Sequence, residues 1–226
     1  RTNCIILYTE GIYLVNSINI KSDVEASLVS ILTDLIGLRS DYPPGDTVEI
    51  CRYTEHRLNN LGYRIKNHMH VTPINNLIVE MGDGSPSVVF NVHVDTVGSG
   101  LLSAWSMDPC RAEIKDKRVY GLGAANCKGS MALHIWLAEE ISRRGGIRNG
   151  TISFTFVGDE ESLGPNGTKS LRDQSIVRPD ILIVGAPSSN NLLIDERGVM
   201  WLRLTTRGTG GHAGDPASAD NAIDRL

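Results

Sequence analysis

Three short apolar runs, each closed by a polar cluster, constrain the fold of this chain more than any other feature. They are SVVFNVHVD at 87–95, TISFTFVGDEES at 151–162 and ILIVGAPSSN at 181–190. Runs of this length that are rich in β-branched and aromatic residues are typical of buried strands. Helical segments alternate with them, so the chain is predicted to form an α/β sheet with helices on both faces. Ligands bind such sheets at the carboxyl ends of the strands, where the three polar clusters are expected to converge.

Periodic segments and turn residues predict the other elements. Asp46 and Glu49 follow a Pro-Pro-Gly loop and fit a capping box, and Gly62 fits a helix stop. The helix at 129–146 is amphipathic and ends in Arg and Gly. The expected elements are helices at 23–38, within 42–62 and at 129–146, with further strands at 63–67 and 76–81.

Composition excludes several classes of partner. The 226 residues carry a net charge of −4 and no block of Lys or Arg, which argues against nucleic acid and against a membrane surface. The longest apolar runs, such as CIILY at 4–8, are far below the roughly 20 residues of a membrane span. The four cysteines have no CxxC spacing, which predicts reduced thiols in a cytoplasmic protein.

The glycine-rich segment VYGLGAANCKGS at 119–130 raises the possibility of a phosphate loop. A P-loop places glycine before lysine, but here the order is Lys128, Gly129 and Ser130. A dinucleotide loop would need glycine at the position of Asn126. Both nucleotide interpretations therefore fail.

His93 and Asp95 lie two residues apart at the end of an apolar run. On a strand this spacing places both side chains on one face. A neutral imidazole can bind a metal through one nitrogen while a carboxylate orients the ring, as is usual around zinc. A core histidine paired with a neighbouring aspartate is the alternative.

Adjacent carboxylates at Asp159, Glu160 and Glu161 end the next apolar run. Such groups repel one another in a cleft, so they indicate a bound cation, a shared proton or a solvated acidic loop. One of them could bind a cation while its neighbour acts as general base. His212 lies among glycines that would let backbone approach a ligand. The other histidines, His56, His68, His70 and His134, are expected to be solvated.

Taken together, the motifs resemble the two-zinc amidohydrolases that include acetylornithine deacetylase, succinyl-diaminopimelate desuccinylase and carboxypeptidase G. The likeness runs from about Leu32 to the end of the chain. Its motifs are YPPGDT, NVHVDTV, Trp105 with Asp108 and Pro109, VYGLGAANCKGS, DEES, GAPSSN, ERG, and GGHAGDP followed by NAI. Residues 1–20 have no counterpart in it.

The resemblance implies a catalytic α/β domain interrupted by a smaller lid that dimerises. Residues 21–196 would then be the N-terminal part of a catalytic domain with a mixed sheet, and 197–226 the start of an α+β lid with a strand and a helix. It also implies hydrolysis of an amide bond in an N-acyl amino acid or small peptide by a homodimer that binds one or two zinc ions.

Roles for five residues follow from the resemblance. His93 would be a zinc ligand and Asp95 its partner. Glu160 would be the general base, and Glu161 a ligand of the other zinc. His212 matches the lid histidine that reaches a neighbouring subunit's site and steadies the oxyanion.

Two motifs depart from the family pattern, the glycine-rich segment at Leu122 and Asn126 and the third polar cluster at Ala186. The family has a zinc-bridging aspartate where this chain has Asn126, and a zinc-binding glutamate where it has Ala186. A neutral amide oxygen is a poor substitute for a bridging carboxylate. Two hypotheses stay open: an active metal-dependent amidohydrolase, or an inactive relative that binds an amino-acid-like ligand or serves as a dimeric partner.

Overall fold

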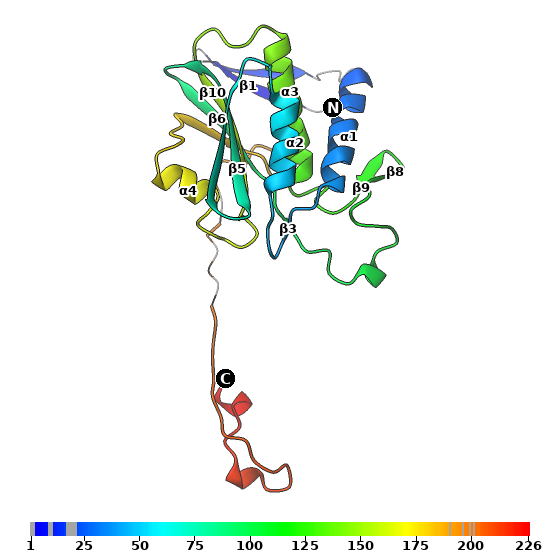
Figure 1. The fold of residues 1–226 in the computed structure, drawn as a ribbon, viewed down its shortest axis with the longest axis vertical. Coiled ribbons are helices and arrows are strands. Elements are labelled where there is room, and N and C mark those ends of the chain that lie inside the picture. The colour runs from blue at the N-terminus through cyan, green and yellow to red at the C-terminus, as the bar shows by residue number, and fades with distance from the viewer. Residues whose placement is uncertain are drawn as a thin grey trace. The chain divides into compact units, whose positions relative to one another are not determined.

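A computed structural model describes residues 3–8, 11–16, 22–189, 191–195, 197–198, 200 and 202–226 (Figure 1). The chain divides into two compact units, Arg1–Pro187 and Ser188–Leu226, which are described separately. The sequence predicts a boundary after residue 196, which stays a prediction.

A five-stranded sheet forms the centre of the first unit, in the order β11-β6-β10-β5-β4. Strands β6, β10 and β11 are parallel, and β5 runs antiparallel to both β10 and β4. The sheet is therefore mixed, as predicted. The strands are β4 (Arg64–Val71), β5 (Ile74–Asp83), β6 (Ser87–His93), β10 (Gly150–Val157) and β11 (Ile181–Val184).

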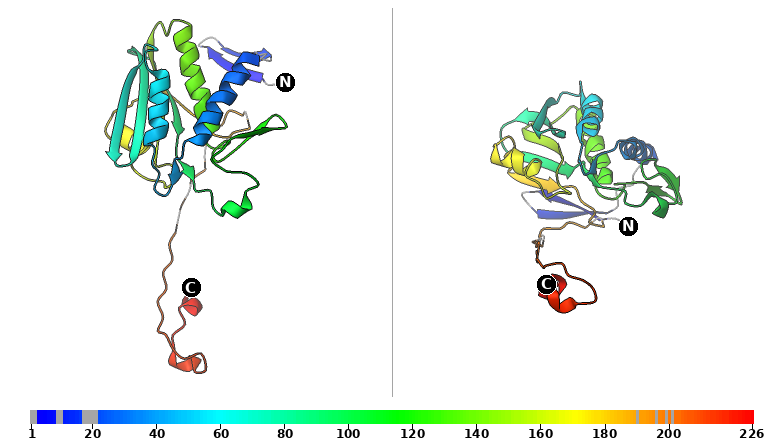
Figure 2. Two further views of the ribbon diagram at one scale, coloured as in Figure 1. Left: turned by 45° about the vertical axis from the view of Figure 1, so that its right-hand side comes forward. Right: turned by 60° about the horizontal axis from the view of Figure 1, so that its bottom comes forward.

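Helices lie on both faces of this sheet, which confirms the predicted fold class (Figure 2). On one face α2 (Val48–Leu58) and α3 (Lys128–Arg143) pack against the strands, and α1 (Ser22–Gly37) packs against α3. On the other face Leu171 of α4 (Thr168–Asp173) packs with Ile78 and Val157 of the sheet.

The amphipathic pattern of α3 explains how the main core forms. Met131, Ile135 and Ala138 recur at helical spacing and are fully buried, and they join Phe154 and Phe156 of β10 in one cluster. Burying one large apolar side chain contributes about 1.5–3 kcal/mol. This core fixes α3, and with it the start of the helix at Lys128, against the sheet.

Smaller elements complete the first unit. Within residues 1–20, the described residues form an antiparallel pair, and 1, 2, 9, 10 and 17–20 lie outside the described part. The pairs are β1 (Asn3–Tyr8) with β2 (Gly11–Asn16), β3 (Asp41–Tyr42) with β7 (Thr96–Val97), and β8 (Glu113–Lys115) with β9 (Arg118–Tyr120); a 3₁₀ turn spans Leu102–Ala104.

The expected capping box at the start of α2 is wrong. Thr47 is the N-cap residue, and its hydroxyl is engaged with the backbone of Asn75, donating to the carbonyl at 2.7 Å and accepting from the N–H at 2.8 Å. Asp46 accepts a hydrogen bond from the N–H of Val48 at 3.0 Å, and Glu49 pairs with Arg52. The tertiary contact to β5 therefore displaces the local cap.

Strand β11 was expected to be buried, but its four side chains are 42–60% exposed. Among the described elements it pairs only with β6, so it lies at an edge of the sheet. An apolar sequence can indicate a strand without indicating whether the strand is central.

The second unit differs from the expected strand and helix. Its described residues contain an isolated bridge between Thr209 and Asp220 and the 3₁₀ turns Pro216–Ser218 and Ile223–Arg225. Leu202 and Leu204 are each 74% exposed. A strand needs a neighbouring strand for its backbone hydrogen bonds, and the described residues of this unit supply only that one bridge.

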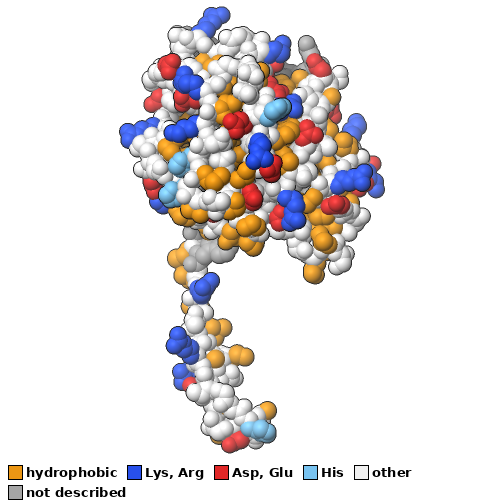
Figure 3. Space-filling view, viewed as in Figure 1, with side chains coloured by type: hydrophobic (Ala, Val, Ile, Leu, Met, Phe, Trp, Pro, Cys, Tyr) orange, Lys and Arg blue, Asp and Glu red, His pale blue; other side chains and the backbone are white. Residues whose placement is uncertain are grey.

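On the face of the first unit seen in Figure 3, basic and acidic side chains are interspersed. None of the described helices combines the length and apolar character that crossing a membrane would require.

His134 is buried, so the prediction that it is solvated is wrong. The side chain is 4% exposed on α3, with ring centroids 5.6 Å from Phe90 and 6.2 Å from Phe154. Its Nδ1 has no hydrogen-bond partner. Burial disfavours the charged imidazolium and lowers the pKa of His134 to about 4.

Replacing His134 with leucine is expected to remove a pH-dependent part of the folding stability. The folded ring titrates near 4 and the free ring at 6.5, so the unfolded state binds more protons between these values. The contribution of the neutral ring is complete above pH 6.5 and is lost as the pH falls toward 4. As the pH falls from 7 to 4, the free energy of unfolding of the wild type should therefore drop by roughly 3 kcal/mol more than that of His134→Leu.

Urea unfolding at several pH values measures this difference. His56→Leu is the matched control, because His56 is exposed on α2. A difference between wild type and His134→Leu that stays constant from pH 7 to pH 4 would contradict the assignment.

Candidate functional site

Parallel pairing of β6 and β10 brings two of the predicted polar clusters together. The register places His93 opposite Val157, and the N–H of Val94 donates to the carbonyl of Val157 at 2.8 Å. The residues that follow the two strands therefore leave the sheet side by side. The third cluster follows β11, where the N–H of Gly185 donates to the carbonyl of Asn91 at 2.8 Å.

The imidazole of His93 is 8% exposed and held in a defined orientation. Its Nδ1 lies 2.9 Å from the backbone oxygen of Asp95, an acceptor, so Nδ1 carries a proton. Its Nε2 points to the other side, 3.3 Å from Oδ1 of Asn126 and 3.8 Å from Oε2 of Glu160. Nε2 is thus the nitrogen that is available to bind a ligand such as a metal ion.

Charged and polar neighbours favour a proton on His93. Burial disfavours the charged ring, but the nearby side chains of Asp95, Cys127 and Glu160 favour it and raise the pKa of His93 to about 11. A cation that binds Nε2 displaces this proton, because a histidine ligand is neutral.

Asp95 connects His93 to the acidic loop. The side chain is fully buried, and its Oδ2 accepts the N–H of Glu161 at 3.0 Å. Its Oδ1 lies 3.5 Å from Nδ1 of His93 and makes no hydrogen bond. The structure places Asp95 beside His93, where the expected orienting role is possible; that role stays a prediction.

His93, Glu160 and Glu161 form a group with the geometry of a cation site. One ligand atom from each lies within 4.8 Å of the others. Burial, followed by the charge of Glu160, raises the pKa of Glu161. An imidazole nitrogen and carboxylate oxygens bind zinc at about 2.0–2.2 Å, so atoms this close can share one ion. The donor set fits one divalent cation.

A second cation finds fewer donors among the described residues. Asn126 turns its amide oxygen toward His93, at the position where the family pattern has a bridging carboxylate. Ala186 ends in a methyl group and offers no side-chain ligand. The described part of the site therefore lacks the anionic oxygen that would join two ions.

Two residues of the glycine-rich segment, Cys127 and Lys128, lie near the site, and the sequence assigns neither of them a role there. Cys127 is 1% exposed, and its Sγ donates to the carbonyl of Gly185 at 3.3 Å. Lys128 is 2% exposed, its Nζ donates to the carbonyl of Leu38 at 2.7 Å, and burial lowers its pKa to about 8. Lysine is rarely buried, so sequence alone gives no signal of this anchor between α3 and the end of α1.

His212 lies in the second unit, so the structure does not test its expected role. Its Nδ1 accepts the N–H of Gly214 at 3.1 Å. Asn190 and Glu196, in the GAPSSN and ERG motifs, lie outside the described residues.

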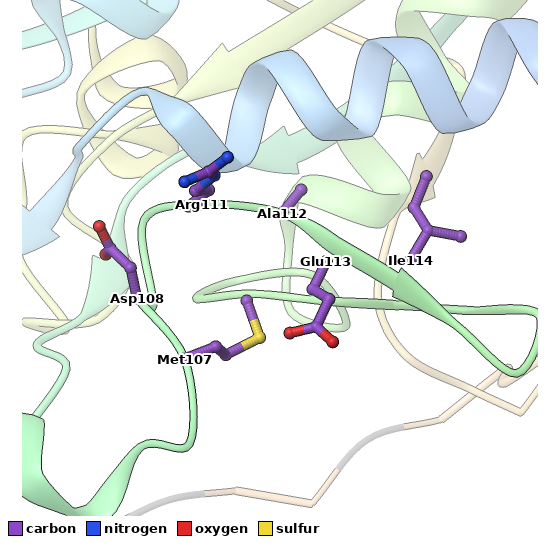
Figure 4. Close-up of a pocket in the computed structure, with 6 residues that line it drawn as sticks. All are labelled: Met107, Asp108, Arg111, Ala112, Glu113 and Ile114. Carbon is purple, nitrogen blue, oxygen red and sulfur yellow. The ribbon is translucent and has the colours of Figure 1, made fainter.

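A shallow cavity of about 430 Å³ lies elsewhere in the first unit (Figure 4). It is lined by Met107, Asp108, Arg111, Ala112, Glu113 and Ile114, and by none of the His93 group. This loop contacts the glycine-rich segment, since the N–H of Leu122 donates to the carbonyl of Pro109 at 2.7 Å. The His93 group therefore lies outside this cavity.

Comparison with known proteins shows which enzymes this chain is similar to. The chain is 40% identical over 161 residues to a succinyl-diaminopimelate desuccinylase of Parvibaculum lavamentivorans, a match over 68% of this chain and 40% of that protein. It is 32% identical over 210 residues to the enzyme of the same name from Acidiphilium cryptum, over 89% of this chain and 54% of that protein. The chain thus spans about half the length of these relatives or less.

Similarity in structure shows the same fold. Human carnosine dipeptidase 1 superposes with a TM-score of 0.61 at 22% identity, over 75% of this chain and 39% of the dipeptidase. The family described as Peptidase family M20/M25/M40 matches residues 89–201, and the Peptidase dimerisation domain matches residues 194–226. The chain belongs to the M20/M25/M40 peptidase family.

Proposed function

We propose that this chain provides the catalytic residues of a metal-dependent hydrolase that cleaves an amide bond in an N-acyl amino acid or small peptide. One observation carries the proposal: an imidazole nitrogen at the end of β6 and two carboxylates of the loop after β10 lie within 4.8 Å of one another. Family membership supports the reaction class.

His93 and Glu161 are the residues that would hold the cation. Zinc bound there would polarise the amide carbonyl and lower the pKa of a water molecule to about 7. His93 is already oriented through Nδ1, and Glu161 is fixed through its backbone N–H to Asp95.

Glu160 is the group that we assign as general base. Its side chain is 53% exposed, more than that of His93, so it can reach both a water molecule and the substrate. It would take the proton of the attacking water and deliver it to the leaving amine.

The second unit would form the dimer interface. Its residues match a dimerisation domain, which supports a homodimer in which His212 of one subunit approaches the site of the other. The names of the relatives make an N-succinyl amino acid the first substrate to test, with N-acetyl amino acids and dipeptides next.

The free thiols of Cys51, Cys110 and Cys127 are in keeping with a cytoplasmic protein.

Asn126 favours a second candidate, an inactive relative that binds an amino-acid-like ligand or acts as a dimeric partner. Its neutral amide faces His93 in place of a carboxylate. In this candidate the fold and the dimer would be retained without hydrolysis.

Metal content of the full-length protein is the first test. We expect about one zinc per chain, together with hydrolysis of at least one N-acyl amino acid. His93→Ala and Glu161→Gln should each weaken zinc binding by about tenfold or more, because each removes a ligand. Metal analysis and competition with a chromogenic chelator measure stoichiometry and affinity.

Control variants separate ligand loss from general damage. His56→Ala and Glu49→Gln make the same changes on the exposed part of α2 and should leave zinc affinity unchanged. Zinc binding without turnover of any substrate class would select the inactive relative. Absence of zinc from the wild-type protein would refute the proposed hydrolase.

Asn126→Asp is expected to strengthen divalent-cation binding. The new carboxylate would take the place of an amide oxygen that lies 3.3 Å from Nε2 of His93. An added anionic ligand should raise zinc affinity by roughly tenfold or more, measured by the same competition titration.

Asn149→Asp adds the same charge at an exposed position beside the opposite end of β10, and should leave zinc affinity unchanged. Equal affinities for Asn126→Asp and wild type would show that residue 126 does not face the bound ion.

A further inference from the structure

The loop at 158–167, between β10 and α4, carries both Glu160 and Glu161. Buried polar side chains bind it at both ends and in the middle. These contacts do not involve the carboxylates of the two glutamates, so they bear on how the loop is held and not on what it binds.

Asn76 of β5 joins the two ends of the loop. The side chain is fully buried, and its Oδ1 accepts the N–H of Gly158 at 3.1 Å. Its Nδ2 donates to the carbonyl of Asn166 at 2.9 Å and to that of His68 at 3.0 Å. One amide therefore clamps the first and last turns of the loop to the sheet.

Asp159 closes the interior of the loop. Its φ is +66°, in the left-handed region that aspartate tolerates better than most residues, and it is 6% exposed. The carboxylate accepts hydrogen bonds from the hydroxyl of Ser162, from the N–H of Asn166 at 2.9 Å and from its Nδ2 at 2.7 Å. A side chain at Gly164 would overlap this carboxylate, so glycine leaves the space that it fills.

These bonds direct Asp159 inward. A buried carboxylate next to two others is electrostatically unfavourable unless hydrogen bonds compensate it. With three donors on its oxygens, Asp159 is satisfied within the loop and is not part of the group around His93. The left-handed turn at Asp159 also sets the direction in which the chain continues to Glu160.

We propose that Asp159 is a positioning residue, which together with Asn76 and Asn166 holds the carboxylates of Glu160 and Glu161 against His93. The inference rests on the proposed function for the role of the two glutamates. The last link is the N–H of Glu161, which donates to Asp95 and aligns the loop with the end of β6.

Asp159→Asn in the full-length protein is the main test. The amide keeps the shape of the side chain but removes its charge, so the hydrogen bonds that close the loop lose their charge-assisted strength. We expect zinc affinity to fall by about tenfold in a competition titration. We also expect the amide of Glu161 to exchange with solvent at least about tenfold faster in the metal-free protein, while that of Val92 in β6 is unchanged.

Asp180→Asn is the matched control. Asp180 also accepts from a serine hydroxyl, Ser85 at 3.0 Å, and from a backbone N–H, Ser87 at 2.7 Å, but it precedes β11 at the opposite end of the strands. It should leave both readouts unchanged. Ser162→Ala removes a single hydrogen bond to Asp159 and should give a smaller change in the same direction if Asp159→Asn does not fold.

The two readouts separate the two proposals. If wild-type protein binds no zinc, the proposed function fails, and the exchange rate of Glu161 still tests the positioning role. Unchanged exchange in Asp159→Asn, or equal effects of Asp159→Asn and Asp180→Asn, would overturn the inference.

Discussion

The parallel pairing of β6 with β10 is the constraint on which the site depends. Because Val157 lies opposite His93, the chain leaves both strands at one edge of the sheet, and the Val94–Val157 hydrogen bond extends the pairing one residue further. The pairing is held in place by the apolar core of α3 and β10. The imidazole of His93 thus lies close to the carboxylates of Glu160 and Glu161, although more than 60 residues separate it from them in the sequence.

Hydrogen bonds of three buried side chains hold the acidic loop next to the end of β6. Asp95 joins the end of β6 to the acidic loop through the N–H of Glu161. Asp159 closes the loop on itself, and Asn76 fastens both of its ends to β5. The carboxylates are therefore carried by a loop whose shape is set by buried hydrogen bonds, which favours a preformed site.

The sheet, its helices and the proximity of His93 to Glu160 and Glu161 can be predicted from the sequence, because apolar periodicity and strand order determine these features. The burial of individual side chains could not be predicted where it depends on tertiary neighbours. His134 is polar yet packs against the rings of Phe90 and Phe154, and the apolar β11 is an edge strand among the described elements. Asn76 gave no signal either, since its partners are backbone groups that a sequence pattern does not identify. The acidic run draws attention to Asp159, but the pattern does not show that this carboxylate closes the loop and leaves the other two free.

The central claim is that one divalent cation binds between His93 and Glu161. Anomalous diffraction from crystals of the full-length protein grown with zinc tests it most directly. The account predicts a single strong peak within bonding distance of Nε2 of His93 and a carboxylate oxygen of Glu161, with the amide of Asn126 beside it. Peaks only at other residues, or an occupied pair of ions bridged at residue 126, would contradict it.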